Sequence, residues 1–71
     1  MARVTVFLWR EGKWYVAYEP CTGVASQGLS EEEAIRNIKE ALELYLEENP
    51  DEDVYPLEYV KVVTIEVGRR D

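Results

Sequence analysis

A single amphipathic helix is the feature that most constrains the fold of this chain. Ser30 is a candidate N-cap because its hydroxyl can accept an early backbone N–H, and Glu33 completes a Ser-x-x-Glu capping box. Apolar residues then form one stripe at helical spacing: Ala34, Ile35, Ile38, Ala41, Leu42, Tyr45 and Leu46. Pro50 ends the pattern, since proline disfavours helical backbone in the preceding residue. The spacing predicts one helix over residues 31–48, about 27 Å long.

The segments around this helix have the composition of strands. β-Branched and aromatic residues dominate residues 3–10, 13–19, 24–27 and 58–67. The first two segments are separated by a turn containing Gly12, which indicates a hairpin. A helix between two strands of one sheet favours a right-handed crossover, so we expect the last strand to lie parallel to the first. The prediction is a single α+β domain over residues 1–71, of order β-β-β-α-β, with a mostly antiparallel four-stranded sheet and the helix on one face.

The small size of the chain predicts self-association. A domain of 71 residues buries only about 60% of the surface that its unfolded chain exposes, so its stability is marginal. Cys21 is the only cysteine, so no internal disulfide can form, and the chain has no histidine for a zinc site. Oligomerisation is the remaining source of stability, and we expect a homodimer or a higher homo-oligomer.

One helix can cover only one face of the sheet. If Trp9 pairs with Trp14 across the hairpin, alternation places Val4, Val6, Leu8, Tyr15 and Ala17 on one face. That smaller set suits the approach of the helix. The outward set, together with Thr5, then provides the predicted partner or oligomer interface: Phe7, Trp9, Trp14, Val16 and Tyr18. A bulge at Gly12 would mix the two sets, and the tryptophans could instead simply pack as a cross-strand pair that shields the hairpin end.

The formal charge of −7 is concentrated in the middle of the chain. Residues 31–53 contain ten acids and two bases, so this edge repels phosphate backbones and attracts basic partners. The acids predicted to steer a partner are Glu32, Glu40, Glu43 and Glu47. The plainer interpretation is that these side chains only keep the protein in solution. The sequence has no membrane span or signal peptide, so we expect a cytoplasmic protein that binds no nucleic acid directly.

Signatures of catalysis are absent from the sequence. We predict no catalytic residues, no metal site and no cofactor, because no catalytic triad and no glycine-rich phosphate loop is present. Cys21 has no obvious activating base, so a passive thiol is the simpler interpretation. The β-β-β-α-β order matches the first part of a ribonuclease H-like fold, but residues 4–9 lack the acid that a two-metal nuclease needs. The acids at residues 47–53 lack the order of an EF-hand calcium loop.

Several motifs together resemble a known family. Residues 14–20 read Trp-Tyr-Val-Ala-Tyr-Glu-Pro, residues 23–28 read Gly-Val-Ala-Ser-Gln-Gly, and residues 30–34 read Ser-Glu-Glu-Glu-Ala. The helix continues as Asn-Ile-Lys-Glu-Ala-Leu-Glu-Leu-Tyr-Leu-Glu over residues 37–47. This combination resembles the toxin-binding domain of HicB-like antitoxins. The resemblance implies a degraded ribonuclease H-like fold, without nuclease residues, that binds and blocks a small basic HicA-type ribonuclease of a toxin–antitoxin system.

The sequence departs from the family pattern in two places. The connection at residues 20–23 is about one residue shorter and lacks a second proline. Complete HicB antitoxins add a C-terminal DNA-binding domain, whereas only four residues follow Val67, so we expect no DNA-binding domain here. Two alternatives stay open: a stand-alone homo-oligomeric domain with an unrelated partner or ligand, and, less favoured, a metal-dependent nuclease.

Overall fold

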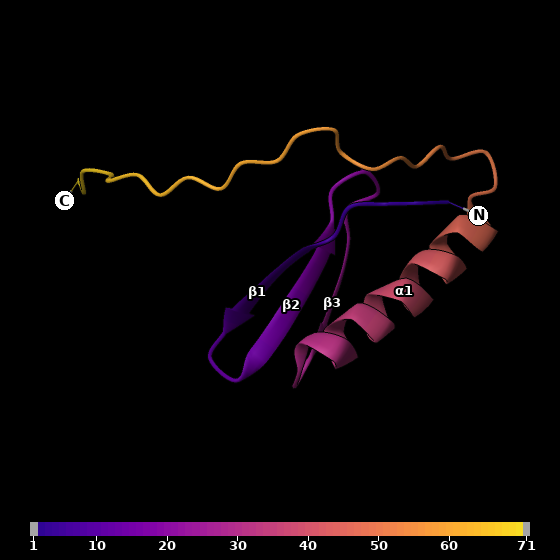
Figure 1. Ribbon diagram of the computed structural model, residues 1–71, viewed down its shortest axis with the longest axis horizontal. Helices are drawn as coiled ribbons and strands as arrows, with labels where there is room; N and C mark the ends of the chain where they lie inside the picture. Colours follow the sequence, from indigo (N-terminus) through magenta and orange to yellow (C-terminus); the bar gives the residue numbers. More distant parts are fainter. Residues whose placement is uncertain (1, 71) are drawn as a thin grey trace.

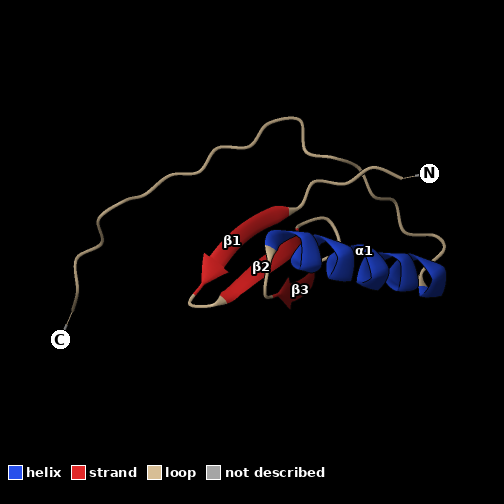
Figure 2. Ribbon diagram, turned by 60° about the horizontal axis from the view of Figure 1, so that its bottom comes forward, coloured by secondary structure: helices blue, strands red, loops and turns tan. Residues whose placement is uncertain are grey.

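The chain folds as a three-stranded antiparallel sheet with one helix, as seen in a computed structural model that describes residues 2–70. The strands are β1 (Phe7–Glu11), β2 (Trp14–Glu19) and β3 (Val24–Gly28), in the order β1-β2-β3, and they are followed by α1 (Glu31–Glu48). The helix lies along one side of the sheet, and the C-terminal part of the chain runs away from both (Figure 1, Figure 2). The α+β class, the strand–strand–strand–helix order and the antiparallel pairing agree with the prediction.

The loop between β1 and β2 is shorter than the sequence predicted. Glu11 pairs with Trp14 and Trp9 pairs with Val16, so the predicted pairing of Trp9 with Trp14 is wrong by two residues. The physical reason is the conformation of Gly12, whose φ of 60° permits a two-residue turn and lets the strands pair up to their ends. Because the displacement is an even number of residues, each side chain keeps the face that alternation assigned to it.

A small apolar core joins the helix to one face of the sheet. Its buried members are Ala17, Ala34, Ile38 and Leu42. The side chains packed against them are Val4, Val6, Leu8, Tyr15 and Val24. The helix therefore covers the smaller-residue face of the hairpin, and the aromatic residues lie on the other face. Ile35 is an exception to the predicted stripe, because 42% of it is exposed although it lies on the same helix.

Both ends of α1 carry local caps. The Ser30 hydroxyl accepts the Glu33 backbone N–H at 3.1 Å, and the N-cap backbone is extended. The Glu33 carboxylate accepts the N–H of Leu29 at 2.8 Å, one residue before the position that a standard capping box uses. At the other end, Asn49 donates its backbone N–H to the Tyr45 carbonyl at 2.9 Å, and Pro50 follows.

The β2–β3 connection is organised by a buried carboxylate that the sequence did not single out. Glu19 is fully buried, and its two oxygens accept three hydrogen bonds. The donors are the Cys21 N–H at 2.8 Å, the Thr22 N–H at 2.8 Å and the Thr22 hydroxyl at 2.6 Å. Gly23, at φ 81°, then turns the chain into β3. Because the buried charge is fully hydrogen-bonded, it fixes this short turn instead of destabilising it.

The ends of the chain differ most from the predicted strands. Residues 3–6 were expected in the first strand, yet β1 begins at Phe7, although Val4 and Val6 still pack on the core. Residues 58–67 were expected as a fourth strand, and the structure assigns no strand to them. They form an extended segment with exposed side chains, drawn in yellow and orange in Figure 1.

Candidate protein-binding surfaces

The uncovered face of the hairpin carries a contiguous set of large apolar side chains, which we call the aromatic face. Its members are Phe7, Trp9, Trp14, Val16 and Tyr18, the same residues that the sequence placed outward. Phe7 and Tyr18 are cross-strand partners whose rings stack, with centroids 6.5 Å apart and planes 15° from parallel. Trp9 is 42% exposed. No described helix covers this face, so its apolar area is available to a second molecule.

The two tryptophans of the aromatic face have polar neighbours at the hairpin end. Trp9 donates its indole N–H to the Glu11 carboxylate at 2.9 Å, and the Lys13 ammonium lies 5.6 Å from the Trp14 ring centroid. Trp9 and Trp14 are not directly opposite each other, because Glu11 is the partner of Trp14. Trp9 and Trp14 are therefore diagonal neighbours on one face and not the directly opposite pair considered from the sequence.

The outward side of α1 is acidic, and we call it the acidic helix face. Its acids are Glu32, Glu40, Glu43 and Glu47, all of which are exposed, and the exposed bases Arg36 and Lys39 lie among them. Glu43 pairs with Lys39 at 3.2 Å, but both side chains are in solvent and such a pair contributes little to stability. The sheet lies between the helix and the aromatic face, so the structure places the two predicted surfaces on opposite sides of the domain. A single compact partner therefore cannot contact the centres of both.

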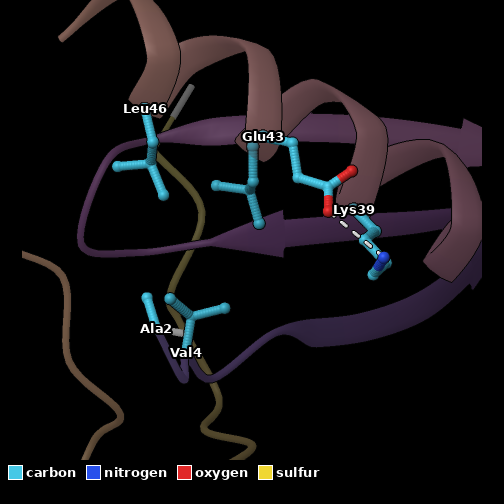
Figure 3. A pocket seen from close by; sticks show the side chains of 6 residues that line it. Ala2, Val4, Lys39, Glu43 and Leu46 are labelled. Atoms are coloured by element: carbon cyan, nitrogen blue, oxygen red, sulfur yellow. Dashed lines mark hydrogen bonds and ion pairs between the residues drawn. The ribbon is translucent and has the colours of Figure 1, made fainter. Parts of the chain in front are cut away.

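An open apolar groove runs between α1 and the strand β1. One hollow of about 350 Å³ is lined by Val4, Leu42 and Leu46, and Figure 3 shows Val4 facing Leu46 with the Lys39–Glu43 ion pair beside them. A second, of about 430 Å³, is lined by Leu8 and Ile35. We call this surface the α1/β1 groove and define it by Val4, Leu8, Ile35, Leu42 and Leu46. The sequence did not predict it, because the stripe was expected to be covered by a complete sheet.

The loop after α1 is fixed to the domain by side-chain contacts. Tyr45 donates its hydroxyl to the Glu52 carboxylate at 2.7 Å, and the Cys21 thiol lies 3.6 Å from the Asp53 carbonyl oxygen. The hydrogen bond to Glu52, with burial and the nearby negative charge, raises the pKa of Tyr45 above its ordinary value of 10.0. The contact of the Cys21 thiol with Asp53 helps to hold this loop on the domain.

The C-terminal segment, residues 58–67, begins beside β1. Just before it, Leu57 donates its N–H to the Thr5 hydroxyl at 2.8 Å. Farther along, Val60 and Val62 share a hollow of about 470 Å³ with Phe7, Leu8 and Trp9, but no backbone pairing joins the two stretches. The exposed fraction reaches 88% at Val62 and 79% at Val67.

Within residues 2–70, no three His, Cys, Asp or Glu side chains gather in a way that could hold a metal ion. Over the same range, no helix has both the length and the apolar character needed to cross a bilayer.

Comparison with known proteins identifies a family but no activity. A UPF0150 protein of Helicobacter pylori strain J99 is 64% identical over 33 residues, which are 45% of this chain and 46% of that protein. The chain thus matches about half the length of this curated relative. No solved structure matches the chain. A family model matches residues 3–69, and the chain therefore belongs to the family of unknown function DUF7387.

Proposed function

We propose that this chain is a non-catalytic, cytoplasmic protein-binding module that acts like an antitoxin and occludes a small basic ribonuclease of the HicA type. The observation that carries the proposal is the aromatic face, a cross-strand array of Phe7, Trp9 and Tyr18 with their neighbours that no element of the domain covers. Tryptophan and tyrosine dominate the centres of protein interfaces because they bury large areas at low entropic cost. The motif resemblance at residues 14–47 supports the same conclusion.

The aromatic face and the acidic helix face have different tasks in this proposal. The aromatic face holds the partner by burial of apolar area. The acids at Glu32, Glu40, Glu43 and Glu47 lie behind the sheet, so they act by attracting a basic protein during approach. Physiological salt screens charges beyond about 8 Å, so the acids affect the association rate more than the stability of the complex. Occlusion follows from covering the active surface of the ribonuclease, without any chemical step by the antitoxin.

We also propose that residues 58–67 form the fourth strand of the sheet, parallel to β1. The support is the α1/β1 groove. Ile35 and Leu46 extend from the helix over a position beside β1 that no described strand occupies. A strand there would bury them and complete the predicted β-β-β-α-β order. The strand-like composition of the C-terminal segment makes it a suitable occupant.

The function is tested by co-expression with the product of the adjacent gene and by calorimetry with a purified basic HicA-type ribonuclease. We expect a stable complex and loss of RNA cleavage. Changing Trp9 and Trp14 together to serine should weaken binding by about 700-fold or more, since central aromatic residues contribute about 2 kcal/mol or more each. The control is Leu44→Ser, because Leu44 is an exposed apolar residue on the helix, away from the aromatic face. Equal affinity for both variants would refute the assignment of the surface.

The two alternatives give different results in the same preparation. A homo-oligomer with an unrelated partner would fail to bind the ribonuclease while remaining folded. A metal-dependent nuclease would cleave RNA by itself in magnesium or manganese. We expect no cleavage, and activity abolished by changing one carboxylate would overturn the non-catalytic assignment.

A further inference from the structure

The C-terminal segment has the properties of a strand without a partner. Its sequence from residue 58 to residue 67 is rich in valine and isoleucine, and its backbone is extended. Apolar side chains point into solvent along its length, and Ile65 and Val67 are more than two-thirds exposed. An isolated strand with this composition is a ready template for pairing with another strand edge. The C-terminal segment therefore needs a free strand edge with which to pair, which we call its acceptor.

Of the two free edges of the sheet, at β1 and at β3, the edge of β1 that faces away from β2 has an open groove beside it and is the better acceptor. β1 is a terminal strand in the sheet order, so its outer backbone groups pair with no described strand. The α1/β1 groove lies next to this edge and is lined by Val4, Leu8, Ile35, Leu42 and Leu46. An added strand would pair its backbone with β1 and place every second side chain in the groove.

The start of the segment indicates the register of this pairing. Within one chain, Leu57 lies beside Thr5, and Val60 and Val62 lie near residues 7–9. An exchanged segment would keep this register on the identical edge of its partner. In a parallel pair, neighbouring residues of the two strands point to the same face. Continuing this register places Val60, Val62 and Thr64 on the groove side with Leu8. The other set, Tyr59, Lys61, Val63, Ile65 and Val67, then extends the aromatic face. The small β-branched set suits a site beneath a helix, and the larger set suits an interface.

The path of the chain points to an acceptor in another molecule. The loop before the segment is fixed by Tyr45–Glu52 and by the hydrogen bond of Leu57 to Thr5, so the point of departure is set. From there the segment passes Phe7, Leu8 and Trp9 without pairing to them, and it then runs outward from the sheet, as both views show (Figure 1, Figure 2). The domain is therefore elongated, with extents of 46 × 27 × 24 Å. The later part of the C-terminal segment points away from the α1/β1 groove of its own chain, and that groove stays open.

We propose that two copies of this chain exchange their C-terminal segments, each copy placing residues 58–67 beside β1 of the other. A two-fold arrangement fills both grooves with identical contacts and leaves neither segment in solvent. The segment of about ten residues spans roughly 33 Å, which exceeds the length of β1, so it can reach a neighbouring subunit and still pair. This inference does not depend on a ribonuclease partner, because it concerns the assembly of the chain with itself.

A disulfide-trapping experiment on the full chain decides which molecule supplies the strand. In a Cys21→Ser background, Arg10→Cys and Val62→Cys place two thiols at neighbouring positions of the proposed pairing, within disulfide distance. After mild oxidation, exchange predicts a covalent dimer on a non-reducing gel, with the peptide containing residue 10 linked to that containing residue 62. An internal disulfide in a monomer, or no linkage between these residues, overturns the proposal. Each single-cysteine variant is the control for random oxidation.

Light scattering of the unmodified protein provides a second measurement. We expect a mass of twice 8.3 kDa at high micromolar concentration. Val62→Pro should convert this dimer to a monomer, because proline removes a backbone N–H and disrupts strand pairing. Arg69→Pro lies beyond the segment and should leave the dimer intact. A monomeric unmodified chain, or a Val62→Pro variant that stays dimeric, contradicts exchange.

Discussion

At Gly28 the helix and the sheet approach each other closely, and replacement of this glycine by alanine should loosen the domain. A Cβ at residue 28 would lie 2.6 Å from the Ala34 backbone nitrogen, 2.8 Å from the Glu33 Cβ and 2.9 Å from the Glu33 carbonyl carbon. Ordinary contacts of this kind are about 3.5 to 4.0 Å. Two of the three atoms belong to the helix backbone and cannot rotate away. The first turn of α1 would therefore have to move about 1 Å away from β3.

Overpacking of this kind costs about 1 to 3 kcal/mol in the free energy of unfolding. For a domain of this size, each kcal/mol corresponds to a shift of roughly 4 to 8 °C in the melting temperature, so a decrease of at least several degrees is expected. Urea unfolding followed by circular dichroism and thermal melts would measure both quantities. Gly68→Ala is the matched control, since nothing lies within 4 Å of its added Cβ and its φ is not positive. Equal urea midpoints for the two variants would refute the close approach.

Three further predictions follow from single side chains. Glu19→Gln should lower the free energy of unfolding by about 1.5 to 3 kcal/mol in urea titrations, because an amide nitrogen replaces a carboxylate oxygen that accepts hydrogen bonds. Ile38→Ala should cost about 2 to 5 kcal/mol, whereas Leu44→Ala, at an exposed site, should change stability by less than about 0.5 kcal/mol. The raised pKa of Tyr45 adds stability that is complete below pH 10 and is lost as the pH rises through the folded-state pKa. Absorbance at 295 nm should show its late titration, and Glu52→Gln should move that titration toward pH 10.

The helix was predictable because its signals are local. The capping hydroxyl of Ser30, the acids of the first turn and the stop at Pro50 lie within or next to the segment they define, and α1 has the predicted bounds of 31–48. The assignment of side chains to the two sheet faces was also predictable, since it depends only on alternation. The hairpin register was not, because a glycine between two strands is compatible with several loop lengths. The positive φ of Gly12 allows a two-residue loop, and this loop fixes the register.

The buried carboxylate and the open groove lay outside what the sequence could indicate. A glutamate at the end of a strand usually points into solvent, and no motif in the sequence indicates that Glu19 is buried among the donors of the turn that follows it. The exposure of Ile35 follows from the absence of a described strand beside β1. Composition identified residues 58–67 as strand-forming, but strand propensity does not specify which edge, or which molecule, accepts the strand.

Strand exchange occupies the edge of the sheet, whereas partner binding occupies one of its faces. The two proposals are therefore compatible, and together they make a further prediction. The exchanged strand pairs in the plane of the sheet, whereas the ribonuclease would contact the aromatic face. The proposed register places Tyr59 and Lys61 of one copy beside Phe7 and Trp9 of the other, which enlarges that face. Val62→Pro should therefore weaken ribonuclease binding by about tenfold, in line with the loss of apolar contacts at the edge of an interface. Tighter binding by this variant would mean that the exchanged strand and the ribonuclease compete for one surface.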